Sequence, residues 1–189
     1  MRIGSSTGGI YSSAYKKNES SMEKVLKQLS TFQRVNNASD DAASLAISQK
    51  LQAQINGYNK GAENAAVGQN LLYTAGGGVE SIESDLQRIR ELAVGASNDT
   101  LTSNDKAAIQ VEIDQLVQNI DDTVANTTFN EQALLDGTFT GKTVGTNSDG
   151  NGLTINLPDL SSEALGIQDF DVTGEFSIDD IDNALSTID

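Results

Sequence analysis

The hydrophobic pattern is clearest over residues 41–94, a stretch that contains no proline. Apolar or small residues recur there in alternating steps of three and four, with the polar Gln69 filling one slot. The recurring positions are Leu51, Ile55, Tyr58, Ala62, Ala65, Leu72, Gly76 and Val79. This spacing is typical of a helix whose heptad-like seam faces a partner helix. The pattern therefore predicts a single long helix, roughly 80 Å in length at the rise of an α-helix.

The stripe continues toward the end of this predicted helix. Its further positions are Ile82, Leu86, Ile89 and Ala93. The steps from Gly76 to Val79 and from Val79 to Ile82 are both of three residues, which is expected to overwind the seam locally. A helix of this kind depends on tertiary packing of its apolar face. We therefore expect other parts of the chain, or other chains, to cover it.

A weaker helical stripe precedes the long helix, over about 12–32. It consists of Tyr15, Met22, Val25, Leu29 and Phe32, with Leu26 widening it and Asn18 filling a gap. This is either an ordinary amphipathic helix of a bundle or an assembly arm that becomes ordered only when subunits meet. Residues 1–11 are rich in Gly and Ser, and we expect them to be poorly ordered in an isolated chain.

The boundaries between elements are marked by capping residues. Residues 36–41 interrupt the periodicity and predict a hinge, with Ser39 or Asp40 as the N-cap of the long helix. Gly95 is a candidate for the left-handed position at the end of that helix. Thr102 and Asp105 have the spacing of a capping box, which predicts a second helix that folds back antiparallel on the first. The stripe of this second helix is Ile109, Ile113, Leu116, Ile120 and Val124.

Residues 127–173 differ in composition, because Thr and Gly become frequent. Short alternating runs at 138–144 and 153–157 flank a strong turn signal at 146–152, which predicts a β-hairpin. The turn resembles the start of a calcium loop, with Asn147, Asp149, Asn151 and Gly152 in the first, third, fifth and sixth positions. The twelfth position, where a bidentate Glu is needed, is Pro158. We therefore favour a polar turn over a metal site.

The last residues have the features of a helix N-terminus. Ser177 is a suitable cap, and Ile178, Ile181, Leu185 and Ile188 follow at helical spacing. The stripe stops at Asp189 without a terminating signal, which we interpret as a truncated chain.

The predicted fold class is mainly α: a long antiparallel helical rod with a small β-hairpin region. The expected divisions are an N-terminal assembly arm and hinge at 1–40, the helical rod at 41–126, a hairpin and loop region at 127–176, and the start of a C-terminal helix at 177–189.

Charge and composition narrow the function further. The net charge is −15, but residues 1–40 hold six basic and three acidic groups, so the remainder carries −18. Such a surface repels phosphate backbones and argues against nucleic-acid binding. The chain has no Cys and no His, which removes disulfides and the commonest metal ligands and general base. We expect no cofactor, no metal and no catalytic site.

The sequence contains neither a visible secretory signal peptide nor an apolar stretch long enough to span a membrane. These signals alone predict a cytosolic protein.

Several segments resemble the N-terminal signature of bacterial flagellins. They are 29–31, 34–47 (Arg-Val-Asn-Asn-Ala-Ser-Asp-Asp-Ala-Ala-Ser-Leu-Ala-Ile), 86–94 (Leu-Gln-Arg-Ile-Arg-Glu-Leu-Ala-Val), 129–130 and 181–185. The match covers nearly all of the chain in order. One departure is Thr31-Phe32-Gln33, where the family has a small residue and Gly, and this bears on the hinge. A larger departure is the absent C-terminal third, which in flagellins returns as antiparallel helices.

The resemblance implies a structural subunit that polymerises into the bacterial flagellar filament and serves motility. It also implies passage through the flagellar type III export apparatus with an export chaperone, and thus a secreted, extracellular location in place of a cytosolic one. The expected subunit-assembly residues are Met22, Val25, Leu29, Phe32, Leu51, Ile55, Tyr58 and Leu72.

Two other functions compete with the filament subunit. A hook–filament junction protein of the same architecture is the alternative, although the Arg-Ile-Arg-Glu-Leu block and the short β insert favour a flagellin. An enzyme is disfavoured, because residues 130–176 contain no His and no paired nucleophile and base.

Flagellins are also ligands of Toll-like receptor 5. The positions of this chain that match the receptor-binding motif are Arg88, Leu92 and Glu112. Arg88 and Leu92 are four residues apart and share one helix face, which Glu112 of the antiparallel helix can join. The alternative is that Leu92 packs in the core and that the two charges belong to a solvated face.

Overall fold

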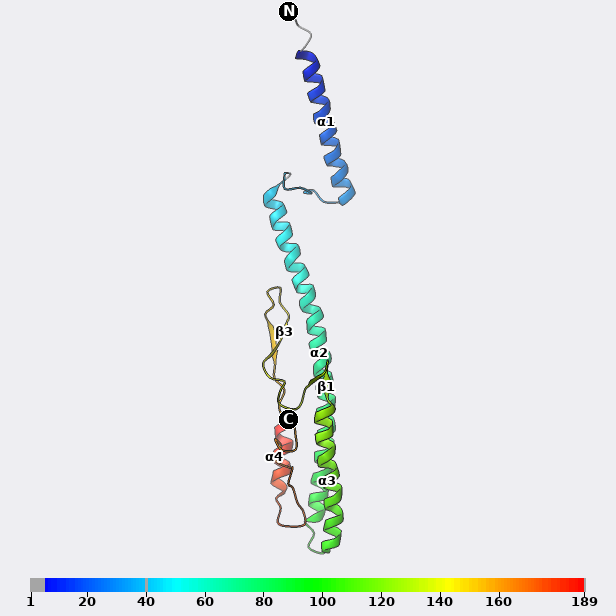
Figure 1. The fold of residues 1–189 in the computed structure, drawn as a ribbon, viewed down its shortest axis with the longest axis vertical. Helices are drawn as coiled ribbons and strands as arrows, with labels where there is room; N and C mark the ends of the chain where they lie inside the picture. The colour runs from blue at the N-terminus through cyan, green and yellow to red at the C-terminus, as the bar shows by residue number, and fades with distance from the viewer. Residues whose placement is uncertain (1–5, 40, 189) are drawn as a thin grey trace, which may run out of the picture. The chain divides into compact units, whose positions relative to one another are not determined.

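The computed structural model describes residues 6–39 and 41–188 and is mainly helical, as predicted (Figure 1). The helices are α1 (Ser6–Thr31), α2 (Ala42–Ala96), α3 (Ser103–Asn126) and α4 (Ile178–Ile188). The strands are β1 (Thr128–Phe129), β2 (Gln132–Ala133), β3 (Lys142–Gly145) and β4 (Gly152–Ile155). The chain divides into two compact units, residues 1–56 and 57–189. None of the described helices is long and apolar enough to cross a membrane.

In the first unit, α1 begins at Ser6, six residues before the predicted start. The predicted start of this helix was wrong, because Ile10 and Tyr11 extend the apolar spacing backwards; residues 1–5 lie outside the described part. The helix ends at Thr31, and Phe32 follows with φ 53°. A left-handed backbone is unfavourable for a side chain of this kind, and glycine is the usual residue there.

The start of α2 corrects the predicted cap. The carboxylate of Asp41 accepts hydrogen bonds from the Ser44 backbone N–H at 3.0 Å and from the Ser44 hydroxyl at 2.6 Å. These bonds hold the pKa of Asp41 below its ordinary value. Ser39 was therefore the wrong choice, since the helix begins one residue after Asp41; Asp40 lies outside the described residues.

The connection between α2 and α3 was predicted in part. The capping box is present: the Thr102 hydroxyl accepts from the Asp105 N–H, and Asp105 accepts from the Thr102 N–H. The left-handed assignment of Gly95 was wrong, because α2 continues through Ala96, which is fully buried. The helix is instead closed by Ser97, whose N–H and hydroxyl both donate to the Ala93 carbonyl.

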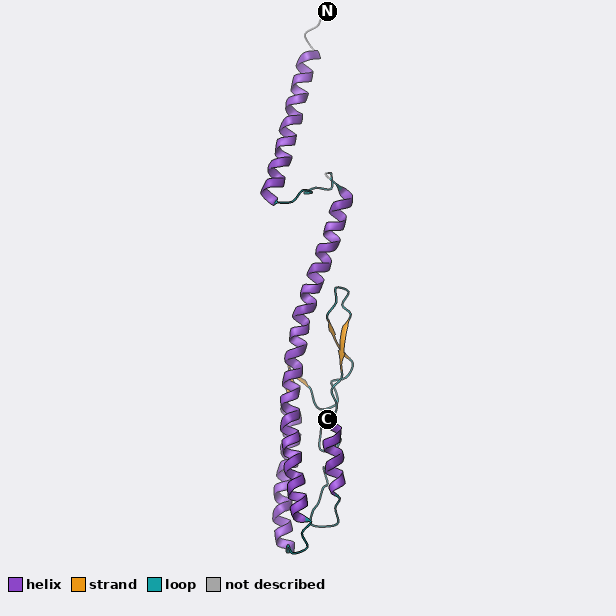
Figure 2. Cartoon of the chain, turned by 180° about the vertical axis from the view of Figure 1, so that it is seen from behind, coloured by secondary structure: helices purple, strands orange, loops and turns teal. Residues whose placement is uncertain are grey.

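The core of the second unit lies where α3 and α4 pack along the C-terminal half of α2 (Figures 1 and 2). The fully buried side chains of the predicted stripes include Ile82, Leu86, Ile89, Ala93, Ile113, Ile120 and Ile181. The covering of the long helix was thus correctly expected for its second half. Truncating one of the large side chains to Ala typically costs about 2–5 kcal/mol.

The predicted hairpin is formed by β3 and β4, which pair antiparallel from Lys142↔Ile155 to Gly145↔Gly152. Its turn is closed by backbone bonds, because the N–H groups of Thr146 and Asn147 both donate to the Asn151 carbonyl. Residues 6–39 and 41–188 contain no group of three or more acidic side chains placed to hold a metal ion.

A second, smaller pair of strands was not predicted from the sequence. In it, β1 and β2 pair around Asn130 and Glu131, both of which have a positive φ.

Candidate functional site

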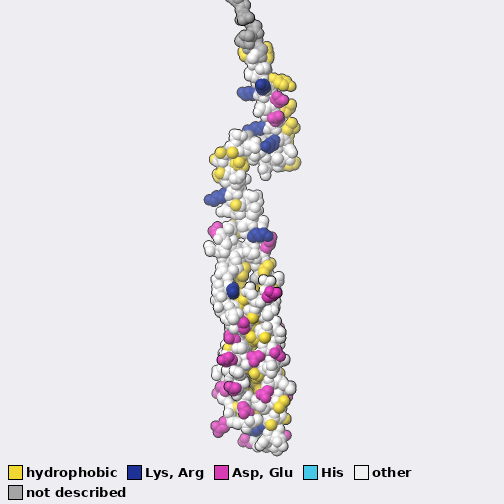
Figure 3. Space-filling view, viewed as in Figure 1, with side chains coloured by type: hydrophobic (Ala, Val, Ile, Leu, Met, Phe, Trp, Pro, Cys, Tyr) yellow, Lys and Arg dark blue, Asp and Glu magenta, His cyan; other side chains and the backbone are white. Residues whose placement is uncertain are grey.

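The eight candidate assembly residues are all exposed in the structure. Their exposed fractions run from 43% at Leu72 to 95% at Phe32. The full set is Met22, Val25, Leu29, Phe32, Leu51, Ile55, Tyr58 and Leu72. In the first unit apolar side chains follow α1, and Figure 3 shows them as a yellow band there. The stripe is thus available to a partner, while its role in assembly stays a prediction.

In the second unit, the β3–β4 hairpin lies on residues 57–72 of α2. The two elements enclose an apolar hollow of 220 Å³, here called the hairpin groove. Its lining residues are Ala65, Gly68, Gln69, Leu72, Val144, Thr146, Leu153 and Ile155. Leu72 is the one predicted assembly residue that lines this groove, and the hairpin leaves its side chain partly exposed.

Two glycines of α2, Gly57 and Gly61, allow the hairpin to approach so closely. A Cβ added at Gly61 would lie 2.0 Å from the Thr146 carbonyl oxygen, and one at Gly57 would lie 2.8 Å from the backbone of Ser148. At Gly68 a Cβ would make ordinary contact with Val144 at 3.4 Å. The spacing of these glycines was visible in the sequence, but nothing there indicated which segment they contact.

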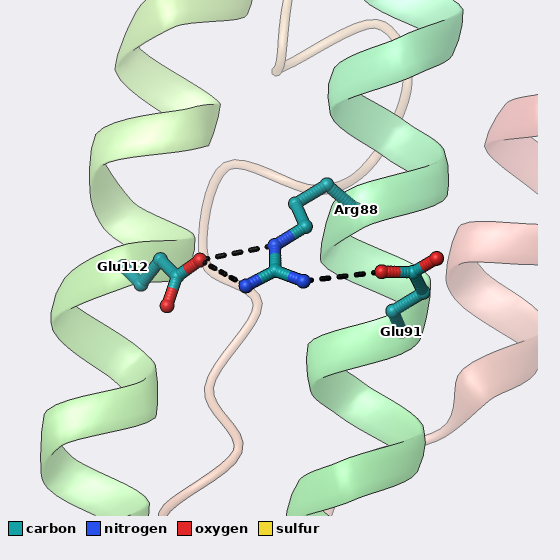
Figure 4. A network of polar contacts seen from close by, with 3 residues as sticks. All are labelled: Arg88, Glu91 and Glu112. Atoms are coloured by element: carbon teal, nitrogen blue, oxygen red, sulfur yellow. Dashed lines mark hydrogen bonds and ion pairs between the residues drawn. The ribbon is translucent and has the colours of Figure 1, made fainter.

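A polar cluster joins α2 to α3 and contains two of the three predicted receptor residues (Figure 4). The Arg88 Nε and a terminal nitrogen donate to the same Glu112 oxygen at 3.0 and 2.7 Å. The other terminal nitrogen of Arg88 donates to Glu91 at 3.1 Å. These bonds, with that to Glu112 the strongest, raise the pKa of Arg88 above its ordinary value. The guanidinium is half exposed and held in a fixed direction.

Leu92, the third predicted receptor residue, is oriented differently. It is half buried and packs against the core of the second unit. The structure therefore brings Arg88 and Glu112 together, whereas part of the Leu92 side chain has a structural role. Glu91 was not among the predicted residues, although its position three residues after Arg88 on the same helix indicates such a pair.

A second ion pair fixes α4 on α2. Arg90 Nε donates to Asp182 at 2.6 Å, and this bond lowers the pKa of Asp182. Both side chains are about half exposed, so the pair contributes little to stability and serves mainly to define the position of α4.

The loop after β4 is attached to α3 by two side chains that the sequence did not indicate. The Asp121 carboxylate accepts bonds from both the N–H and the hydroxyl of Ser162, at 2.9 and 2.8 Å. The Gln110 amide accepts from the Val172 N–H and donates to the Phe170 carbonyl. These contacts hold residues 162–172 against α3.

One carboxylate of the helix pair is incompletely satisfied. The Asp85 Oδ2 is buried without a hydrogen-bond partner among the described residues, while Asn119 bonds the side chain. Burial raises the pKa of Asp85 above its ordinary value, and the Asn119 bond opposes this. Ionising Asp85 in the folded chain is therefore unfavourable in free energy, at the contact between α2 and α3.

One family model and several known proteins match this chain, and all of them belong to the same family. Residues 10–140 match the family model described as the bacterial flagellin N-terminal helical region. A flagellin of Clostridium tyrobutyricum is 49% identical over 66% of this chain and 33% of its own length. A flagellin of Halalkalibacterium halodurans is 40% identical, over 88% of this chain and 64% of its own. A flagellin of Bacillus subtilis is 36% identical, over 87% of this chain and 59% of its own length. The chain thus spans between one third and just under two thirds of these relatives.

Proposed function

Because the chain belongs to the family of the bacterial flagellin N-terminal helical region, we propose that it is a structural subunit of the flagellar filament. The observation that carries this proposal is the uncovered apolar stripe of α1, which includes Met22, Val25 and Leu29. Large apolar surfaces on a soluble protein indicate an interaction site. Neighbouring copies in a filament would cover the stripe.

Burial of the α1 stripe by neighbouring copies would contribute substantially to subunit association. Burying one such side chain completely contributes about 1.5–3 kcal/mol, so a few residues of α1 supply a substantial part of a subunit contact. The exposed residues Leu51 and Ile55, at the start of α2, add to the same kind of surface. Tyr58 and Leu72 supply further apolar contacts from the second unit.

The hook–filament junction protein remains the alternative function. The three relatives described above are all named flagellin, which favours the filament subunit. A junction protein would be present in few copies at one end of the filament, so its location distinguishes the two.

The proposal includes export and an extracellular location. A filament subunit has to leave the cell through the flagellar type III export apparatus, with an export chaperone protecting its apolar segments. A chain without Cys suits such a route, because no disulfide forms that would hinder passage of the unfolded chain.

Immunogold electron microscopy of the bacterium that makes this chain tests the proposal. Antibodies against residues 127–176 should label flagellar filaments along their length. Leu29→Glu should abolish labelled filaments, while Ser30→Glu, an exposed neighbour outside the stripe, should leave them intact. Label confined to the base of the filament would support the junction protein, and unlabelled filaments would overturn both.

We also propose that the Arg88–Glu112 cluster is a binding face for Toll-like receptor 5. This proposal is supported by the direct contact between Arg88 and Glu112 and by the half-exposed guanidinium of Arg88. An arginine held in one direction is a favourable contact residue, because it combines a planar set of donors with an apolar stem. Leu92 would contribute through its exposed part.

A further inference from the structure

The middle of α2 contains three consecutive glycines, Gly76, Gly77 and Gly78. Glycine is an unfavourable residue inside a helix, since it has the greatest backbone freedom to lose and no side chain to pack. A helix of 55 residues that keeps three of them together needs a physical reason at each position.

Packing explains one of the three. A Cβ added at Gly78 would lie 2.7 Å from the Thr127 hydroxyl oxygen and 2.9 Å from a Leu135 methyl carbon. A larger residue at this position would require the side chains of Thr127 and Leu135 to shift. At Gly76 and Gly77, in contrast, an added Cβ has nothing within 4 Å. Both are exposed, and no contact with a described residue requires glycine there.

The two bare glycines lie between two differently supported parts of α2. On the N-terminal side, the β3–β4 hairpin covers the helix as far as Leu72. On the C-terminal side, support begins at Gly78 with Thr127 and Leu135. Between them the helix is held on one face only, where Ala75 is buried.

We propose that Gly76 and Gly77 form a hinge at which α2 bends between its hairpin-supported and its bundle-supported part. A bend there disrupts few packing contacts, because no described neighbour lies within 4 Å of a Cβ added at either glycine. The position coincides with the irregular step of the seam from Gly76 to Ile82. The hinge is a property of the single chain and goes beyond the proposed filament function, so it can be tested without polymerisation.

Distance measurement by paired spin labels tests the hinge directly. The chain has no Cys, so labels attach only at introduced positions. One pair, Asn70→Cys and Ser84→Cys, spans the glycines; a control pair, Glu80→Cys and Val94→Cys, spans an equally long glycine-free part of α2. Both separations should centre near 20 Å along a straight helix, about 1.5 Å for each residue. The distribution across the glycines should be clearly the broader of the two.

Substituting Gly76 and Gly77 then tests whether these glycines cause the broader distance distribution. Gly76→Ala with Gly77→Ala should narrow the first distribution to the width of the control. Each substitution should also slow hydrogen exchange of amides 77–81 about fivefold, because alanine is favoured in the helix by that factor. Gly95→Ala, at a glycine equally free of neighbours, should leave both readings unchanged. Equal widths for the two label pairs, or a width that the double substitution does not alter, would overturn the hinge.

Discussion

A matched pair of glycine substitutions in α2 should have opposite effects. Gly61→Ala and Gly76→Ala are the same chemical change in the same helix. The Cβ added at position 61 would lie 2.0 Å from the Thr146 oxygen and 2.6 Å from its carbonyl carbon, while that at position 76 has open space. The neighbour at position 61 is backbone, so it cannot rotate away, and the hairpin has to move by more than 1 Å to restore van der Waals contact, roughly 3.4 Å.

The expected changes in stability follow from the contacts that the hairpin loses. Lifting it breaks the bond from the Asn64 amide to the Gly145 carbonyl, worth about 1 kcal/mol. It also exposes part of Val144 and Ile155, worth about 1–3 kcal/mol together. The better helix propensity of alanine returns about 1 kcal/mol. Gly61→Ala should therefore destabilise the attached hairpin by about 1–3 kcal/mol, whereas Gly76→Ala should stabilise the helix by about 0.5–1 kcal/mol.

Hydrogen exchange of the β3 and β4 amides measures the first effect, and thermal unfolding measures the second. An isolated two-stranded hairpin is at best marginally stable, so its amides should exchange much faster in Gly61→Ala than in the unchanged chain. The amides of α3 serve as an internal reference for the global fold. Wild-type protection of the hairpin in Gly61→Ala would show that Gly61 is not needed for its attachment, and a lower melting temperature for Gly76→Ala would show that Gly76 is needed for stability.

Three further outcomes are expected. Arg88→Ala should weaken binding to Toll-like receptor 5 by about 1–3 kcal/mol without lowering the melting temperature, with Arg90→Ala on the α4 side as control; unchanged affinity would show that the cluster is only a solvated face. Asp85→Asn should raise stability at neutral pH, because the raised pKa of Asp85 makes its ionisation unfavourable in the folded state. This stability gain should shrink as pH falls through that raised pKa toward about 3.9, where the wild-type carboxyl is itself protonated, and a gain independent of pH would contradict the assignment. Amides of 6–31 should exchange faster than those of 80–125 in a dilute monomer, since the α1 stripe is uncovered; equal protection would show that the stripe has found a partner within the chain.

Much of the helical fold could be predicted from the sequence because its signals are local. Apolar spacing indicated the long helix almost to the residue, and Thr102 with Asp105 marked the start of α3. The errors were also local: Asp41, and not Ser39, caps α2, and Gly95 lies inside the helix. Several polar residues compete for one cap, and only the actual first turn decides between them.

Long-range contacts could not be predicted in the same way. Asp121 and Ser162 are 41 residues apart, and Gln110 and Val172 are 62 apart, with no periodicity linking them. Gly61 was likewise visible as a glycine, but its contact with the hairpin depends on where residues 142–155 pack. The Arg88–Glu112 contact was anticipated because two antiparallel helices with a short connection bring such positions together. Leu92 packs partly against the core, and its role in receptor binding stays a prediction.

The central claim is that the apolar stripe of α1 is covered by other copies of this chain in a flagellar filament. Cryo-electron microscopy of filaments from the bacterium that makes the chain tests it most directly. We expect density for this chain along the filament, with Met22, Val25 and Leu29, which are exposed in the single chain, buried against neighbouring subunits. Filaments that lack the chain, or in which these three side chains remain exposed to solvent, would contradict it.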